Sequence, residues 1–392
     1  MTSSGAARKV RVVVAEDSAV MRKIIVTALE RHPDIDVVHV AVNGLQAVEA
    51  VAKYRPDVVT SDVEMPEMDG VAALKEIRKL DAKLPVIMFS TLTQDGAPMA
   101  ASVLTAGATD FVGKPASSAG SVGVFKVLEE QLIPKVVGFG RRHQARAALG
   151  NNAPRPAMAS VQNAQPGTSA PSEKRPTFAA ADNRRADTGK QVIRHPARAV
   201  CIAVSTGGPM ALMEVFGQLK TPLPVPVFIV QHMPSSFTTS LAARLTASGV
   251  MKVIEPHEGE IAEAGVAYMA PGGLHMVLSK KGTKTHIHLT EDPPENSCRP
   301  AADVLFRSAA EVYGKDLLAV VLTGMGYDGM KGCEVIRARG GQVVAQDEAT
   351  SVVWGMPGAV VQNNLADEVL PIGRIADEIV FRTRKVPAGR SA

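Results

Sequence analysis

AVCIAVSTGGP, at residues 199–209, sets the architecture of the second half of the chain. Its first six residues are apolar, and a short apolar run bounded by turn residues is typical of a buried β-strand. Ser205 follows this run directly, and Gly207 and Gly208 allow the backbone to turn sharply into a helix. The stretch therefore predicts a strand, a tight turn and a helix, which is the unit that builds α/β sheets.

Two further junctions place polar residues in the same way. His232 follows the apolar run 227–230, and Asp328 lies in a glycine-containing loop after the run 317–322. Because the carboxyl ends of parallel strands share one edge of a sheet, where ligands bind, we expect Ser205, His232 and Asp328 to lie close together. Such a trio can supply a nucleophile, a general base and an orienting acid. The pattern therefore indicates a hydrolase.

Each of these residues also has an ordinary structural interpretation. Ser205 can be a helix N-cap, and Asp328 can belong to a turn. The glycines after Ser205 can also cradle a phosphate, although neither a G-x-G-x-x-G motif nor a P-loop lysine accompanies them. His275 is a second candidate for a site histidine, and His257 lies among glutamates and is expected to be exposed. Ala203 stands where a G-x-S-x-G motif has its first glycine, and the order Ser–His–Asp is not that of α/β-hydrolases.

Composition limits the class of protein. The chain has 392 residues, 46% hydrophobic and 21% charged, which is typical of a soluble globular protein with two or three domains. Its net charge of +4 is small, and arginines gathered between the domains predict a solvated tether rather than a nucleic-acid site. The three cysteines form neither a disulfide framework nor a metal-ligand spacing. No apolar run approaches the roughly 18 residues of a membrane span, and no signal peptide is evident, so we expect a cytoplasmic protein without membrane insertion.

The chain divides into three segments by periodicity. Residues 9–137 alternate β-branched runs with amphipathic stretches in five βα units, which predict a doubly wound parallel sheet. Residues 138–197 lose this periodicity and are rich in Ala, Pro, Ser, Asn, Gln and Arg, which predicts a flexible linker. The rhythm of strands and helices resumes over 198–385, where we expect an α/β domain with a mostly parallel sheet. The strands expected in the first segment are Val10–Ala15, Asp36–Val40, Asp57–Thr60, Pro85–Phe89 and Thr109–Val112.

Three carboxylates converge at the strand ends of the first segment. Glu16 and Asp17 end the first expected strand, and Asp62 ends the third. Mg²⁺ suits such a group, because it binds one or two carboxylates and keeps waters for a phosphate donor. Asp62 could then attack a phosphoryl group and become an aspartyl phosphate. Ser90 and Lys114, which end the fourth and fifth strands, could hydrogen-bond the phosphoryl oxygens.

These acidic motifs resemble the receiver domain of two-component response regulators. The resemblance rests on Glu16-Asp17-Ser18, on DVEMPEMDG at 62–70, on Ser90-Thr91 and on Lys114-Pro115. It implies that Asp62 is the phospho-acceptor and that Glu16, Asp17 and Asp62 bind Mg²⁺. It also implies that Ser90, Lys114 and the aromatic Phe111 form the switch that responds to phosphorylation.

The second half resembles the catalytic domain of the chemotaxis protein-glutamate methylesterases (CheB). The resemblance covers roughly 198–382 and rests on STGG at 205–208, QHMP at 231–234, APGG at 270–273, RPAADVLF at 299–306, TGMGYDG at 323–329 and AQDEATS at 345–351 through GMP at 355–357. It implies Ser205 as nucleophile, His232 as general base and Asp328 as orienting acid, with the backbone amide near Met325 as oxyanion donor. Two positions depart from the family pattern: Ala203 replaces a glycine, and Tyr327 replaces an asparagine.

The two resemblances together imply a phosphorylation-regulated enzyme. It would hydrolyse glutamate methyl esters, and also deamidate certain glutamines, on the cytoplasmic helices of methyl-accepting chemoreceptors, with no cofactor for ester hydrolysis. A histidine kinase of the pathway would supply the phosphoryl group. We expect the unphosphorylated receiver to pack over the strand-end edge and block the substrate, and phosphorylation to loosen that contact.

Two other functions fit parts of the sequence. A response regulator can carry a non-catalytic protein-docking output, and an α/β domain can bind a nucleotide through its glycine turns. A DNA-binding output is disfavoured, because no helix-turn-helix with a basic recognition helix is evident near the C-terminus. Trp354 can line a substrate groove or fill the core, and its neighbours Val352 and Val353 favour the core.

Overall fold

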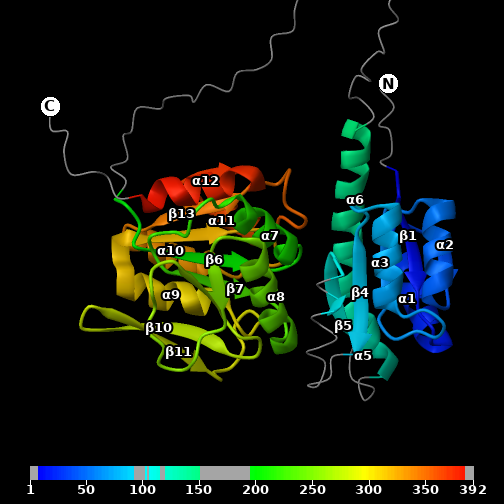
Figure 1. Ribbon diagram of the computed structural model, residues 1–392, viewed down its shortest axis with the longest axis horizontal. Coiled ribbons are helices and arrows are strands. Elements are labelled where there is room, and N and C mark those ends of the chain that lie inside the picture. Colours follow the sequence, from blue (N-terminus) through cyan, green and yellow to red (C-terminus); the bar gives the residue numbers. More distant parts are fainter. Residues whose placement is uncertain (1–7, 92–101, 104–105, 115–119, 151–194, 385–392) are drawn as a thin grey trace, which may run out of the picture.

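The structure is a computed structural model that describes residues 8–91, 102–103, 106–114, 120–150 and 195–384. Figure 1 shows two sheets flanked by helices, the first coloured blue to cyan and the second green to red. We call residues 8–150 the first domain and residues 195–384 the second domain. Within the described residues, no helix has the length and apolar character needed to cross a lipid bilayer.

The first domain is built on a five-stranded parallel sheet in the order β2-β1-β3-β4-β5. This order confirms the predicted doubly wound fold, because the chain begins in the interior and winds outward in both directions. The strands are β1 (Val10–Ala15), β2 (Ile35–Ala41), β3 (Val58–Asp62), β4 (Val86–Thr91) and β5 (Asp110–Lys114). The helices are α1 (Ala19–Glu30), α2 (Gly44–Tyr54), α3 (Gly70–Leu80), α5 (Gly120–Val127), the π-helical turn η2 (Leu128–Leu132) and α6 (Ile133–Gly150).

Side-chain caps begin the helices that follow the strand ends. The side chain of Ser18 accepts a hydrogen bond from the Met21 amide, and that of Asn43 accepts one from the Gln46 amide. Asp69 caps α3 in the same way. Each cap satisfies an otherwise unpaired amide of the first helical turn and fixes where the preceding loop ends. The loops that carry Asp17 and Asp62 are thereby held at the carboxyl edge of the sheet.

Helix α6 differs from the sequence prediction. We expected a flexible linker from residue 138, but the helix runs on to Gly150. Val136 and Phe139 are buried in the core of the first domain, and Gly140 packs closely against Val10. Glycine lowers helix propensity and interrupts apolar periodicity, so tertiary packing, not local preference, accounts for this helix. Residues 151–194, the larger part of the expected linker, lie outside the described residues.

The second domain is built on a seven-stranded parallel sheet in the order β14-β13-β12-β6-β7-β9-β8. An antiparallel hairpin of β10 and β11 accompanies it, and the predicted mostly parallel sheet is confirmed. The strands are β6 (Ala199–Val204), β7 (Val227–Gln231), β8 (Lys252–Ile254), β9 (Val266–Met269), β10 (His275–Lys281), β11 (Lys284–Thr290), β12 (Leu317–Val321), β13 (Gln342–Gln346) and β14 (Glu368–Leu370). The helices are α7 (Gly208–Gln218), α8 (Ser235–Ser248), α9 (Ala302–Tyr313), the 3-10 turn η3 (Gly314–Asp316), α10 (Met330–Ala338), α11 (Met356–Gln362) and α12 (Ile372–Thr383).

Strand β6 lies at the centre of this sheet and is buried on both faces. Val200, Ile202 and Val204 belong to one hydrophobic cluster, while the alternate residues, including Cys201, belong to the cluster on the opposite face. Burial of both faces explains why the strand is apolar without alternation. It also places Ser205, the first polar residue after the strand, at the edge of the sheet.

Candidate active site

Three neighbouring strands of the second sheet bring Ser205, His232 and Asp328 to one edge. Ser205 follows β6 and His232 follows β7, while Asp328 lies in the loop after β12, and these strands are adjacent in the order β12-β6-β7. Backbone hydrogen bonds tie their ends together. The His232 amide donates to the Val204 carbonyl over 3.2 Å, and the Ser205 amide donates to the Thr323 carbonyl over 3.0 Å. We call this region the active-site edge.

His232 and Asp328 form a direct pair. The Nε2 atom of His232 lies 2.7 Å from Oδ2 of Asp328, whose side chain is buried. The carboxylate also accepts the backbone amides of Ala302 at 2.6 Å and of Asp303 and Gly329, each at 3.1 Å. A carboxylate can only accept, so Nε2 carries the proton and Nδ1 carries the lone pair of the neutral ring.

The charges of this pair reinforce each other. Burial alone raises the pKa of Asp328, but the hydrogen bond and charge of His232 and the amide donors outweigh it, so the pKa lies below its usual value. Burial alone lowers the pKa of His232, but hydrogen bonds to Asp328 and Cys298 outweigh it and raise the pKa of the imidazole to about 9. The environment therefore favours an imidazolium beside an ionised carboxylate.

Ser205 lies against the glycine loop that follows β12. A Cβ atom added at Gly324 would stand 2.9 Å from Cβ of Ser205, so only glycine permits this approach. The N-cap of α7 is Gly207 and no side chain caps this helix, so the interpretation of Ser205 as an N-cap is wrong. Within the described residues the Ser205 hydroxyl makes no hydrogen bond. Nδ1 of His232 faces the Cys298 sulfur at 3.6 Å instead.

The loop beside Ser205 also offers a backbone donor. Met325 directly follows Gly324, and within the described residues its amide donates no hydrogen bond. The side chains of Met325 and Tyr327 are 37% and 52% exposed, so this loop presents apolar surface next to the serine. A free amide at this place can stabilise negative charge that develops on a bound carbonyl oxygen.

The other candidate residues have structural contacts. His275 is buried, and its ring accepts a hydrogen bond from the Ala301 amide at Nδ1 and lies 3.2 Å from the Pro293 carbonyl at Nε2. His257 is exposed, as predicted. Trp354 is half-buried and donates to the Gln346 carbonyl over 3.0 Å. Cys201 and Cys333 are fully buried.

Three residues next to the pair were not predicted from the sequence. Cys298 contacts His232, and the side-chain amide of Asn296 donates to Asp328 over 2.8 Å and to the buried carboxylate of Asp303 over 2.9 Å. These residues come from the segment between β11 and α9 and from the first turn of α9. The RPAADVLF motif contains Asp303, but nothing in the motif indicates that it lies beside Asp328.

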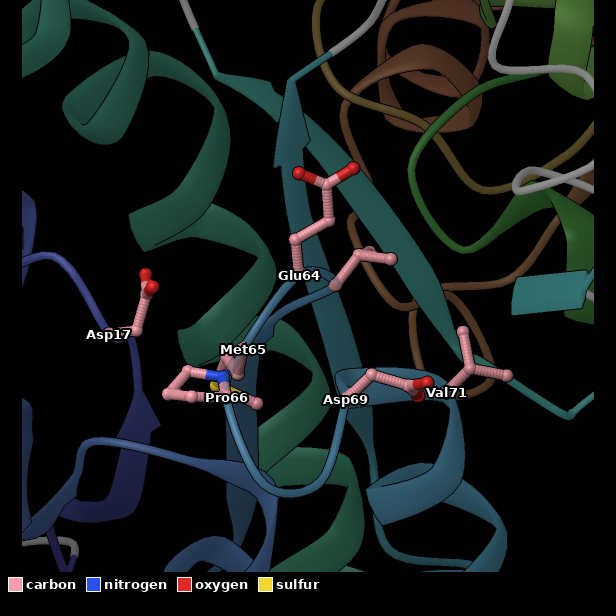
Figure 2. Close-up of a pocket in the computed structure, with 7 residues that line it drawn as sticks. Asp17, Glu64, Met65, Pro66, Asp69 and Val71 are labelled. Atoms are coloured by element: carbon pink, nitrogen blue, oxygen red, sulfur yellow. The ribbon is translucent and has the colours of Figure 1, made fainter.

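The acidic residues of the first domain also converge. Ligand atoms of Glu16, Asp17 and Asp62 all lie within 4.8 Å of one another. The Lys114 ammonium contacts Asp62 and lies 3.1 Å from Oε1 of Glu16. Figure 2 shows the adjoining pocket, which Asp17 lines from the end of β1 and Glu64, Met65, Pro66, Asp69 and Val71 line from the loop after β3 and the start of α3.

Glu16 is the least satisfied member of this group. Its side chain is buried, and Oε2 lies 3.0 Å from the Lys114 nitrogen without hydrogen-bond geometry. Burial, together with the charge of Asp62, raises the pKa of Glu16 to about 7 despite the opposing effect of Lys114. A buried carboxylate oxygen without a hydrogen bond, beside two further carboxylates, fits the donor set of a hard divalent cation.

Of the two remaining switch candidates, only Phe111 can be described in full. Ser90 lies in β4 and pairs with Gly113, but its side chain is outside the described residues. Phe111 of β5 stacks on Phe237 of α8 in the second domain, with ring centroids 4.0 Å apart and an interplanar angle of 7°. The expected switch aromatic is thus part of the contact between the domains.

The domain contact reaches the active-site edge. Oδ2 of Asp110 accepts the Gly207 amide at 3.1 Å, two residues after Ser205, and forms an ion pair with Lys135 at 2.9 Å. Val352, which follows β13, packs into the hydrophobic core of the first domain. Figure 1 shows β5 and α6 on the side of the first domain that faces α7 and α8. The first domain therefore covers the part of the edge next to Ser205.

Fold and site together define a class of protein: a doubly wound domain with three carboxylates gathered at its strand edge, joined to an α/β domain that brings a serine, a histidine and an aspartate to one edge of its sheet. Comparisons with known proteins agree. The family model for the response regulator receiver domain matches residues 12–120, and that for CheB methylesterase matches residues 200–379.

Two relatives match along nearly the whole chain. A protein-glutamate methylesterase/protein-glutamine glutaminase of Trichodesmium erythraeum is 41% identical over 374 residues, which cover 95% of this chain and 99% of the relative. One from a Nocardioides species is 44% identical, covering 97% and 98%. The solved catalytic domain of the CheB methylesterase of Thermotoga maritima is 40% identical, covers 48% of this chain and 99% of that chain, and has a TM-score of 0.47. The chain therefore belongs to the CheB protein-glutamate methylesterase family, and both resemblances found in the sequence are confirmed.

Proposed function

We propose that the second domain hydrolyses glutamate methyl esters on chemoreceptor helices with Ser205 as nucleophile, His232 as general base and Asp328 as orienting acid. The observation that carries this proposal is the 2.7 Å contact between His232 and Asp328. His232 follows β7, and Ser205 follows the neighbouring strand β6. Because Nε2 of His232 binds the carboxylate, Nδ1 is the atom that accepts the serine proton.

The reaction proceeds in two acyl-transfer steps. Ser205 loses its proton to Nδ1 of His232 as its oxygen bonds to the ester carbonyl carbon, and the Met325 amide stabilises the oxyanion. The C–O bond to the methoxy group then breaks, His232 returns the proton, and methanol leaves. Water, deprotonated by His232, attacks the acyl-enzyme, and the products are the glutamate side chain and free Ser205. A glutamine side chain follows the same route and releases ammonia. We expect neither reaction to need a cofactor.

The first domain receives the phosphoryl group. In our proposal Asp62 is the phospho-acceptor, a histidine kinase of the receptor pathway is the donor, and Glu16, Asp17 and Asp62 hold Mg²⁺. When bound, the ion neutralises negative charge on the carboxylates and on the phosphate oxygens. Lys114, which contacts Asp62, would pair with the phosphoryl oxygens, and Ser90 would donate to them. In our proposal the protein acts in the cytoplasm, where the receptor helices lie, and nucleic acid is not among its partners.

Control by phosphorylation follows from the domain contact. The stack of Phe111 on Phe237 and the bond from Gly207 to Asp110 hold the first domain over the active-site edge. A receptor helix needs access to Ser205, so this arrangement corresponds to a resting state. Phosphorylation of Asp62 would act through Lys114 at the carboxyl end of β5 and reorient Phe111, which is next to Asp110 at the amino end of the strand, and so weaken both contacts.

Release of methanol from methylated receptor membranes tests the hydrolytic proposal. The Ser205→Ala variant should release methanol at the background rate, whereas Ser235→Ala, at an exposed serine on the start of α8, should match the wild type. Ser205-independent release would exclude the proposed nucleophile. Receptor binding without any Ser205-dependent release would favour the alternative, a protein-docking output.

A further inference from the structure

One side-chain amide joins two buried carboxylates next to His232. The Nδ2 atom of Asn296 lies 2.8 Å from Oδ1 of Asp328 and 2.9 Å from Oδ2 of Asp303, and both aspartates are at most 2% exposed. An amide NH2 group has two hydrogens, so it can donate one to each carboxylate. Two ionised carboxylates at this separation repel each other, and the shared donor offsets that repulsion.

The backbone holds Asn296 in an unusual conformation to achieve this. Asn296 and Ser297 have φ values of 52° and 60°, and Glu295 and Cys298 pair with each other through backbone hydrogen bonds of 2.9 and 3.1 Å. Two consecutive residues with positive φ are typical of a type I′ turn, in which asparagine and glycine are favoured. Arg307 of α9 anchors the turn through a bidentate ion pair with Glu295, at 2.6 and 2.7 Å.

The donors to Asp328 show what the amide contributes. Oδ2 of Asp328 faces His232 and the Ala302 amide, and Oδ1 accepts Asn296 together with two backbone amides. Within the described residues, Asn296 and His232 are the only side chains that donate to this carboxylate. Asn296 therefore anchors the oxygen that His232 does not use and fixes the rotation of the carboxyl group.

We propose that Asn296 is a positioning residue for ester hydrolysis, and that its amide holds the Asp328 carboxylate ionised and oriented toward His232. This inference rests on the proposed roles of Ser205, His232 and Asp328. Asn296 touches neither the serine nor the substrate in this account, and it acts only through Asp328.

Further charged and titratable groups surround the Asn296 amide and the two carboxylates that it joins. His232 approaches from the loop after β7, and Asp303 and Arg307 approach from α9. Glu295 and Cys298 belong to the turn. From α10, the charge of Lys331 lowers the pKa of Glu295, and the charge of Asp303 helps to raise the pKa of the buried Cys333. Without the Asn296 amide, no shared donor offsets the repulsion between Asp303 and Asp328. The two carboxylates would then take up a proton more readily, and His232 would lose its ionised partner.

A purely structural role makes a different prediction from a donor role. If Asn296 only forms the turn, glycine serves equally well, because it adopts positive φ at lower cost, and aspartate also tolerates this conformation. If Asn296 acts as a donor, Asn296→Gly removes it, and Asn296→Asp keeps the shape but replaces the NH2 group by a third carboxylate. Ser297→Gly is the matched control, because Ser297 is exposed and has the same backbone conformation.

The experiment measures kcat and KM for methanol release between pH 6 and 9 for the full chain and these variants, with Ser205→Ala alongside. We expect kcat to fall about 10- to 100-fold in Asn296→Gly and Asn296→Asp, with KM nearly unchanged and Ser297→Gly like the wild type. In Asn296→Asp the ratio of variant to wild-type kcat should rise as the pH falls, because the introduced carboxyl, once protonated, can again donate one hydrogen bond.

Each outcome decides a separate question. Wild-type kcat in both Asn296 variants, with Ser205→Ala inactive, overturns the positioning role and leaves the proposed function intact. An active Ser205→Ala variant overturns the proposed function itself. Circular dichroism reports whether each variant is folded, and if Asn296→Gly is not, Asn296→Asp provides the test. A pH-independent loss in Asn296→Asp contradicts the donor role.

Discussion

His232 has to be neutral to act as a base, yet its surroundings favour the charged form. Burial works against the imidazolium, but Asp328 and the Cys298 contact outweigh burial and raise the pKa to about 9. The fraction of enzyme with a neutral imidazole therefore increases as the pH rises toward 9, and kcat/KM should increase with it. The same shift stabilises the fold below the unfolded pKa of histidine, and this contribution is lost as the pH rises through 9.

Cys298 offers a direct test of this balance. Its sulfur lies 3.6 Å from Nδ1 of His232 and helps to raise the pKa of the imidazole. In Cys298→Ala that pKa should fall, so the rising limb of kcat/KM should move to lower pH and activity at pH 7 should increase severalfold, since one pKa unit corresponds to about a tenfold change in the neutral fraction. The pH–rate profile measures this, and an unmoved limb would contradict the assigned role of the thiol.

Glu16 predicts a pH dependence in the receiver domain. Its pKa of about 7 in the folded protein lies above the ordinary glutamate value of 4.5, so the native state retains the proton and loses stability as the pH rises between these values. In the absence of Mg²⁺, Glu16→Gln should remove this loss, and its melting temperature should depend less on pH than that of the wild type between pH 5 and 8.

Binding of Mg²⁺ to Glu16 should stabilise the receiver domain, whereas the ionised carboxylate without the ion destabilises it. At pH 8 the ion should raise the melting temperature of the wild type more than that of Glu16→Gln, because the variant lacks one carboxylate ligand. Glu64→Gln is the matched control, since Glu64 lines the same pocket but is exposed, and it should behave like the wild type. Equal Mg²⁺ effects in the wild type and Glu16→Gln would exclude Glu16 from the metal site.

At the scale of elements, the loop after β12 decides where Ser205 lies. A Cβ atom at Gly324 would stand 2.3 Å from Sδ of the buried Met356 and 2.9 Å from Cβ of Ser205, and both distances are shorter than side-chain atoms reach without displacement. Gly324→Ala should therefore displace the serine and lower kcat by at least about tenfold, because small misplacements of reacting groups are costly. Gly217→Ala, at an exposed position of α7 with open space at its Cβ, is the control and should retain full activity. Full activity in Gly324→Ala would mean that the loop adjusts freely.

Elements that follow from local patterns were predicted well, and elements that depend on distant contacts were not. The apolar runs before Ser205, His232 and Asp328 form the strands β6, β7 and β12. The shared edge of the parallel sheet explains why these residues converge. Helix α6 was missed because Gly138 and Gly140 weaken its local signal, whereas packing against the first sheet stabilises it. Asn296 and Cys298 were missed because a turn without periodicity brings them to His232.

At the scale of the whole molecule, the domain contact should set the resting activity. Phe111→Ala removes the stack on Phe237, and Asp110→Ala removes the acceptor of the Gly207 amide and of Lys135. Each change lies in the receiver domain, so the methylesterase domain keeps its sequence. We expect each variant to release methanol severalfold faster than the wild type without a phosphodonor. Val369→Ala, at an exposed position on β14, should leave the resting rate unchanged.

We propose that phosphorylation of the receiver domain controls a serine hydrolase. The measurement that tests it most directly is methanol release from methylated receptor membranes, with and without a small phosphodonor and Mg²⁺, for the wild type, Asp62→Asn and Ser205→Ala. We predict that the phosphodonor accelerates the wild type, leaves Asp62→Asn at the resting rate and has no effect on an inactive Ser205→Ala. Phosphodonor-stimulated release by Asp62→Asn, or any release that survives Ser205→Ala, would contradict the account.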